Sequence, residues 1–195
     1  YCKSLKTISI PESMMAINKR TFDSCYALES VDLPGNLIMI DELAFNECRS
    51  LAKIDIPKSV SVINRMAFGS CESLENITLP DGVTVLSTDV FSNCVSLKEL
   101  ILPESIETIE SSAIWGCDNI KSISVPAKTT FIDENAFINK CLESVIVDEE
   151  NKYYKSVDGV LFNKEMTKLI TYPVSKKAEE YTVPDSVKTI CNLEN

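Results

Sequence analysis

The chain has 195 residues, of which 29 are acidic and 19 are basic, so its formal charge at pH 7 is −10. It contains eight cysteines, one tryptophan and no histidine. Without histidine, the chain cannot form a Ser-His-Asp or Cys-His catalytic system, or a zinc site with imidazole ligands. The acidic balance argues against a nucleic-acid partner. No apolar run approaches the roughly 20 residues that a transmembrane helix needs.

Three residue series recur at one fixed interval over most of the chain, which defines a 23-residue repeat. A fixed period between about 20 and 50 residues is typical of solenoids, in which each repeat buries its apolar face against its neighbours. The sequence therefore predicts a stack of about seven coils. The three series are Cys2, Cys25, Cys48, Cys71, Cys94 and Cys117; Pro11, Pro34, Pro57, Pro80, Pro103 and Pro126; and Phe22, Phe45, Phe68, Phe91, Ile114 and Phe137.

Each repeat predicts a strand, a proline turn, a second extended segment and a helical turn. In the third copy, residues 54–56 alternate apolar and polar, which favours a strand with one inward face. Pro57 ends that strand because proline has no N–H to donate, and residues 60–63 form the second extended segment. A polar residue follows at a constant offset and could cap one or two turns of α- or 3₁₀-helix. The capping series is Asn18, Asp41, Asn64, Ser87, Glu110 and Asp133.

The repeat is interrupted after Phe137. The next strand follows its counterpart one position early, so a residue is deleted and Cys141 leaves the cysteine series. Asp158-Gly159 then separates two apolar runs, which is a strong hairpin signal, and residues 168–173 supply a third strand. We therefore predict a repeat array at 1–147, a β-meander insert at 148–182, and a resumed, truncated repeat at 183–195. Both ends cut through a repeat, so we expect a fragment of a longer array.

The repeat resembles the BspA-like branch of the leucine-rich repeat family. The resemblance is carried by the L-x-x-I-x-L-P-x-x-V segment at residues 74–83 and by the Ile, Ala-Phe and Cys positions of residues 63–71. It implies an α/β leucine-rich repeat solenoid: a right-handed, β-rich superhelix of short parallel strands with α or 3₁₀ turns and a small β-meander insert.

The resemblance also implies a function. Proteins of this branch are surface proteins of host-associated bacteria and some protists. A cell-surface or secreted, adhesin-like protein is therefore expected, which binds a protein or glycan such as a host extracellular protein. A structural spacer or scaffold segment of a larger surface protein is the alternative.

The cysteine series allows three interpretations. Stacked cysteines would lie about 5 Å apart, within the range for a disulfide. One inward cysteine in each coil instead favours a ladder of buried free thiols. Zinc is less favoured, because its ligands must converge on one point rather than follow a line. Cys141 and Cys191 lie off the ladder and are predicted to be the more reactive thiols.

Outward side chains of the strands are the candidate partner-binding surface, because solenoids commonly bind through a sheet face. Asp32 and Asp55, on neighbouring coils, could attract a cation or could simply be solvated. The candidate residues are Ser9, Asp32, Asp55, Thr78, Ile101, Ser124, Lys53, Asn76 and Glu99.

Trp115 is a further candidate, either as an exposed contact anchor or as an indole that folds back to complete the core beside Ile114. The sequence supplies no catalytic, cofactor-binding or metal-binding set: it has no Gly-rich phosphate loop and no G-x-S-x-G motif. We therefore expect a protein that is not an enzyme and needs no cofactor.

Overall fold

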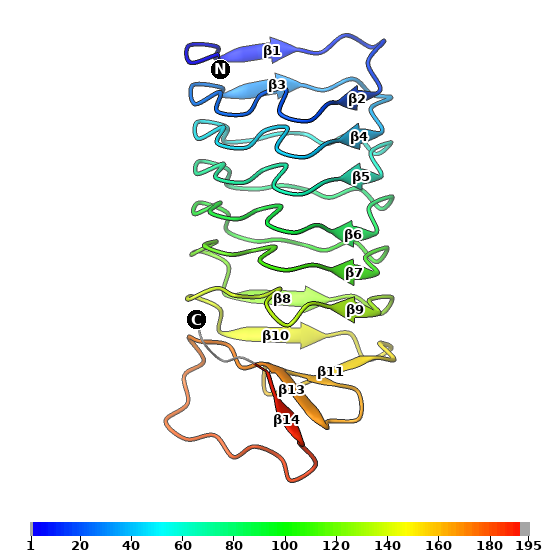
Figure 1. The fold of residues 1–195 in the computed structure, drawn as a ribbon, viewed down its shortest axis with the longest axis vertical. Coiled ribbons are helices and arrows are strands. Elements are labelled where there is room, and N and C mark those ends of the chain that lie inside the picture. The colour runs from blue at the N-terminus through cyan, green and yellow to red at the C-terminus, as the bar shows by residue number, and fades with distance from the viewer. Residues whose placement is uncertain (1, 192–195) are drawn as a thin grey trace.

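The computed structural model describes residues 2–191 as an elongated stack of coils, with the N-terminal coil at one end (Figure 1). Each coil passes through two strand positions, which we call the first-strand face and the second-strand face. It then returns along a turn side built from hydrogen-bonded turns. Residues 2–191 contain no helix, and therefore none that is long and apolar enough to cross a membrane.

The second-strand face carries the most regular pairing. Its strands pair in parallel, as β2-β4-β5 and β6-β7-β9, and each strand pairs with its counterpart one full repeat away. In each strand the second residue is buried, because successive side chains of a strand point to opposite sides. The strands are β2 (Ala16–Ile17), β4 (Met39–Ile40), β5 (Val62–Ile63), β6 (Val85–Leu86), β7 (Thr108–Ile109) and β9 (Phe131–Ile132).

The first-strand face forms strands only near the two ends of the stack. β1 (Thr7–Ser9) pairs with β3 (Ser30–Asp32) at the full repeat offset, with Ile8 opposite Val31. β8 (Ser122–Val125) pairs with β10 (Ser144–Val147) at an offset that is one position shorter, which confirms the predicted deletion. Between these pairs, the described coils share an isolated bridge from residue 53 to residue 76 and single backbone hydrogen bonds such as that from Glu75 to Ala52 (3.2 Å). The turn side joins these middle coils through bonds such as that from Phe68 to Val90 (3.0 Å).

The helical turns expected after each second strand are absent from residues 2–191, so the α/β assignment is wrong and the fold is a β-solenoid. The reason lies in the backbone of the turn side. Each of several coils holds two non-adjacent residues in the left-handed region, such as Arg20 and Ser24, both at φ 60°, and Leu43 and Glu47, at φ 60° and 56°. A right-handed helix cannot continue through such residues.

Alternate N–H groups on the turn side also point in different directions. The N–H of Phe22 donates to the carbonyl of Ala44 in the next coil (2.8 Å), whereas the N–H of Cys25 donates within its own coil to Phe22 (3.1 Å). An α-helix keeps all of its backbone bonds within one segment. The turn side uses alternate bonds to bind the next coil instead.

The inward Phe series forms a continuous aromatic stack. Rings of Phe22, Phe45, Phe68 and Phe91 follow one another with centroid separations of 5.3, 5.6 and 5.7 Å and interplanar angles of 11°, 7° and 12°. Phe45, Phe68 and Phe91 are fully buried. Ile114 is fully buried in the same position of its coil. The predicted inward Phe column is confirmed.

The cysteine ladder lies beside the Phe stack. Cys25, Cys48, Cys71, Cys94 and Cys117 are free and buried, as the favoured interpretation predicts. The thiol of Cys48 donates to the Phe22 carbonyl of the preceding coil (Sγ–O 3.2 Å), and the later ladder cysteines repeat this contact at 3.1–3.2 Å. Burial raises the pKa of Cys48 to about 12 and also raises the pKa of Cys71 and Cys94.

The prediction for the remaining thiols is partly wrong. Cys191 is buried beside Glu134 and Lys168, and burial raises its pKa. Cys2 is exposed although it belongs to the series, and Cys141 is partly exposed.

A thiol-labelling experiment would test this distribution. We expect Cys2 and Cys141 to react with a disulfide reagent at pH 8 in the folded protein, and the buried thiols to react only on unfolding. At pH 8 a thiol with a pKa of about 12 is ionised to only about one part in 10⁴, against roughly a tenth for a thiol at the ordinary pKa of 9.0. Fast labelling of Cys71 or Cys94, read by mass spectrometry of the peptides, would contradict the ladder.

The predicted hairpin and third strand are present at the C-terminal end. β11 (Tyr154–Val157) pairs antiparallel with β12 (Val160–Asn163) across a turn at Asp158-Gly159, and β12 pairs antiparallel with β13 (Lys168–Thr171). β14 (Thr189–Ile190), from the resumed repeat, then pairs in parallel with β13.

The insert does not form a separate body. Side chains of Tyr154, Leu161 and Ile170 enter the main core. A second, smaller cluster around Phe162 and Leu169 joins the insert to Val183 and Val187 of the resumed repeat. The division into an array at 1–147, an insert at 148–182 and a resumed repeat at 183–195 stays a prediction.

Candidate partner-binding surfaces

The predicted residues of the first-strand face are all exposed. They form two parallel columns on one side of the stack, with Ile101 the most exposed large apolar side chain of the described residues, at 68%. The surface is shallow, because its hollow around Lys53, Asp55, Asn76 and Thr78 has a volume of about 140 Å³. The arrangement suits an extended contact better than capture of a small molecule.

Two pairs of polar side chains on this face contact each other, one between coils and one within a coil. Ser9 Oγ donates to Asp32 Oδ2 (2.8 Å), and the ammonium of Lys53 lies 3.0 Å from Asp55 Oδ2. Asp32 and Asp55 thus have separate partners rather than a shared ligand. Within residues 2–191, no cluster of three or more acidic or cysteine side chains could hold a metal ion.

Trp115 is exposed by 47%, which matches the anchor interpretation rather than the core interpretation. Ile114 already fills the core position beside it and is fully buried. Trp115 lies on the turn side, however, so the structure does not bring it together with the first-strand columns.

The second-strand face carries a larger groove that the sequence did not reveal. Its volume is about 440 Å³, and its lining combines the outward valines of β5 and β6 with charged side chains at the start of the turn side. Several of the lining positions are those predicted to cap helices. The polar lining includes Asp41, Glu42, Asn64, Arg65, Ser87 and Glu110.

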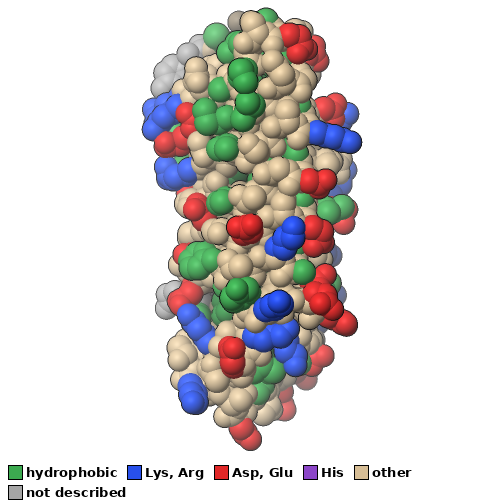
Figure 2. Space-filling view, turned by 90° about the vertical axis from the view of Figure 1, so that its right-hand side faces the viewer, with side chains coloured by type: hydrophobic (Ala, Val, Ile, Leu, Met, Phe, Trp, Pro, Cys, Tyr) green, Lys and Arg blue, Asp and Glu red, His purple; other side chains and the backbone are tan. Residues whose placement is uncertain are grey.

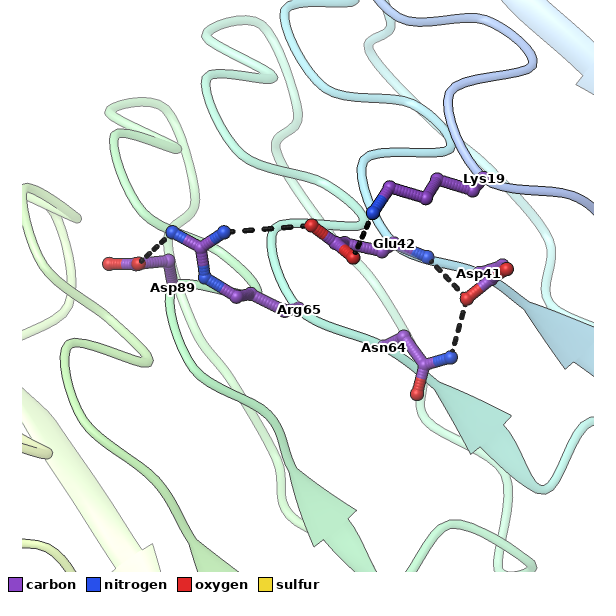
Figure 3. A network of polar contacts seen from close by, with 6 residues as sticks. All are labelled: Lys19, Asp41, Glu42, Asn64, Arg65 and Asp89. Carbon is purple, nitrogen blue, oxygen red and sulfur yellow. Dashed lines mark hydrogen bonds and ion pairs between the residues drawn. The ribbon is translucent and has the colours of Figure 1, made fainter.

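A polar network runs along the edge of this groove from coil to coil (Figure 3). Glu42 lies between Lys19 (2.7 Å) and Arg65 (3.6 Å), and Arg65 also contacts Asp89 (3.6 Å). The ion pair with Lys19 lowers the pKa of Glu42. Because these pairs are partly exposed, each contributes little to stability.

Asp41 and Asn64 form the second part of the network (Figure 3). Asp41 Oδ1 accepts hydrogen bonds from Asn64 Nδ2 and from the N–H of Glu42, both at 2.7 Å. The hydrogen bond from Asn64, and to a smaller extent that from the N–H of Glu42, lowers the pKa of Asp41. The polar residue at this constant offset therefore joins coils instead of capping a helix.

A second cavity of about 440 Å³ lies where the last complete coil meets the insert, and we call it the junction cleft. One wall is residues 130–134, at and after β9, and the other is formed by the insert. Phe131 and Tyr153, each 52% exposed, line it together with buried Tyr154. Its polar groups come from Asp133, Glu134, Asn163 and Lys168.

One signal in the sequence could have indicated the junction cleft. Phe131 occupies an outward strand position at which the earlier coils carry Ala16, Met39, Val62, Val85 and Thr108. An aromatic ring at an outward position is a feature of binding surfaces. The contribution of the insert, by contrast, depends on how the hairpin folds back onto β9.

Charges are mixed on the side that carries the proline turns and second strands. Figure 2 shows a group of hydrophobic side chains near the N-terminal end of this side, further hydrophobic side chains along the stack, and acidic and basic side chains interspersed along its edges. The part of this side that the structure describes therefore offers no continuous patch of one charge sign to a partner.

Comparison with known proteins agrees with this architecture. The family model described as "BspA type Leucine rich repeat region (6 copies)" matches residues 1–68 and 39–166. No curated protein matches the chain.

Solved structures of bacterial leucine-rich repeat proteins are similar over nearly the whole chain. A leucine-rich cell surface protein from Faecalibacterium prausnitzii is 33% identical with a TM-score of 0.83, over 94% of this chain and 50% of that one. The pneumococcal vaccine antigen PcpA is 27% identical with a TM-score of 0.83, over 97% of this chain and 52% of that one. A protein from Eubacterium ventriosum, at 23% identity and a TM-score of 0.74 over 95% and 49%, shares the fold. The chain thus spans about half the length of these proteins, and it belongs to the BspA-type leucine-rich repeat family.

Proposed function

We propose that this chain is a non-enzymatic recognition segment of a cell-surface or secreted protein, which binds a protein or glycan through its first-strand face. The observation that carries the proposal is the pair of exposed columns, repeated at a fixed offset on a stack with a continuous core. Such a surface presents many small contacts in register, which suits an extended partner.

The printed descriptions of the similar structures support the location. One is described as a cell surface protein and another as a vaccine antigen. Adhesion to a host extracellular protein is the form of recognition we propose, and it concerns the whole protein of which this chain spans a part.

Chemistry at the cysteines supports a non-enzymatic role. A nucleophilic cysteine needs a lowered pKa and access to substrate. Here burial raises the pKa of four ladder thiols, and each of the four donates a hydrogen bond to a backbone carbonyl: Cys48, Cys71, Cys94 and Cys117. The ladder is a structural element rather than a reactive one.

Charge reversal on the first-strand face tests the proposal. We expect the combination of Asp32→Lys, Asp55→Lys and Ile101→Glu to weaken partner binding at least roughly tenfold, because it replaces groups at the centre of the surface. Binding is measured by surface plasmon resonance against purified extracellular-matrix proteins.

The control is Glu107→Lys, a single reversal from carboxylate to ammonium at an exposed position on the second-strand side. It should leave binding unchanged, and all variants should keep the unfolding midpoint of the parent. If the triple variant binds as well as the parent, the first-strand face is not the site.

A structural spacer is the second candidate. The aromatic stack and the backbone bonds between coils form one continuous column, as a rigid spacer requires. Lack of binding by the unmodified chain to every protein and glycan tested would favour this function over recognition.

A further inference from the structure

The walls of the junction cleft are fixed to each other before any ligand binds. The N–H of Ile132 in β9 donates to the hydroxyl of Tyr154 in β11 (2.8 Å), and Lys168 of β13 forms an ion pair with Glu134. These two contacts join the solenoid to the insert. A site of this kind loses little conformational entropy on binding.

Hydrogen bonds fix the backbone segments that carry the two exposed rings, Phe131 and Tyr153. The N–H of Phe131 donates to the carbonyl of Glu107 (3.2 Å), and the N–H of Tyr153 donates to Asn151 Oδ1 (2.9 Å). Asn151 is fully buried and also donates to two backbone carbonyls, so it fixes the loop that carries Tyr153. Both rings are therefore exposed without being on loose segments.

Charge in the cleft discriminates among ligand classes. An anionic ligand would lie beside Asp133 and Glu134, and the cation that the lining supplies, Lys168, is already paired with Glu134. A cationic ligand would lie beside that same ammonium group. A purely apolar ligand would bury these charges without hydrogen bonds, which is costly.

A neutral ligand rich in hydroxyl groups satisfies all of these conditions. Hydroxyl groups both donate and accept, so they can bond the carboxylates and the ammonium group alike. The C–H groups on one face of a pyranose carry slight positive charge, which is attracted to the negative face of an aromatic ring. The volume of about 440 Å³ lies within the range of small-ligand sites.

We propose that the junction cleft binds a neutral saccharide unit, with Phe131 and Tyr153 covering its apolar C–H face and Asp133, Glu134 and Lys168 bonding its hydroxyl groups. This site is separate from the first-strand face and does not depend on which partner that face binds. The insert is then part of a binding site rather than a simple interruption of the stack.

A glycan microarray tests this inference with the unmodified chain and matched variants. The array carries glycans ending in neutral sugars (galactose, mannose, fucose and N-acetylglucosamine), sialylated and sulfated glycans, and glucosamine as a cationic probe. We expect retention on one or more neutral glycans. Phe131→Ala and Tyr153→Ala should each lower the affinity at least roughly tenfold, measured by titration calorimetry with the best glycan.

Conservative variants and a distant one serve as controls. Tyr153→Phe and Phe131→Tyr keep the rings and should retain binding within about threefold, whereas Ile101→Glu on the first-strand face should have no effect. Thermal unfolding of each variant confirms that it is folded.

Three results would overturn the inference: no retention on any neutral glycan, retention only on charged glycans, or unchanged affinity in the Phe131→Ala/Tyr153→Ala double variant. None of these results bears on matrix-protein binding by the first-strand face, so the two proposals can fail separately.

Discussion

Replacing Phe68 by alanine is expected to lower the free energy of unfolding by about 3–5 kcal/mol. Phe68 is fully buried and lies between Phe45 and Phe91 in the aromatic stack, at 5.6 and 5.7 Å. The substitution removes both ring contacts and leaves a cavity that the coils above and below cannot fill without breaking their backbone bonds. Urea denaturation followed by circular dichroism measures the loss.

Two other substitutions separate the role of the stack from the general effect of removing a phenylalanine. Phe131→Ala, at a half-exposed ring, should cost about 1 kcal/mol or less. Phe68→Ile should be intermediate, because Ile114 fills the same position in its own coil. A loss below roughly 1 kcal/mol for Phe68→Ala would contradict the buried column.

Alkaline pH should destabilise the protein through the cysteine ladder. Burial raises the pKa of four ladder thiols, to about 12 for Cys48 and Cys117, above an ordinary value of 9.0. Below about pH 8 these thiols are almost fully protonated in both states, and their contribution to stability is complete. As the pH rises from about 9 towards 12, the unfolded chain loses these protons and the folded chain keeps them, so stability falls.

The expected slope is about 1.4 kcal/mol per pH unit for each such thiol. Urea unfolding at pH 8, 9, 10 and 11 measures it, and the Cys71→Ala/Cys94→Ala variant controls for lysine and tyrosine titration. We expect the variant to lose stability less steeply between pH 9 and 11 than the parent. Equal slopes for the two proteins would show that the thiols do not ionise preferentially in the unfolded chain.

Repetition made most of the fold predictable. Strand pairing such as Ile8 with Val31 follows directly from the repeat period, and pairing of Val145 with Ile123 follows from the deletion. The turn side was not predictable in the same way, because Ala44, Phe45 and Cys48 fit one face of a helix as well as they fit this turn. The left-handed backbone conformation of residues such as Leu43 excludes the helix. The pattern of apolar and polar side chains does not predict that conformation.

The candidate surfaces were predictable to different degrees. Exposure of Asp55 or Ile101 follows from alternation within a strand. The junction cleft combines Phe131 of the array with Tyr153 and Lys168 of the insert, and their proximity results from the direction in which the hairpin folds. Periodicity says nothing about contacts between an array and a segment that interrupts it.

The alternating charges between coils have a consequence for the order in which coils associate. Because the coils have nearly the same shape, a coil could also pair with the next coil but one. Repeat proteins are prone to this kind of misassembly. Such a skip would place Lys19 against Arg65 instead of Glu42, and like charges would then meet. Ion pairs between coils that add little to the stability of the folded protein can still favour the correct order of coils over a misassembled one.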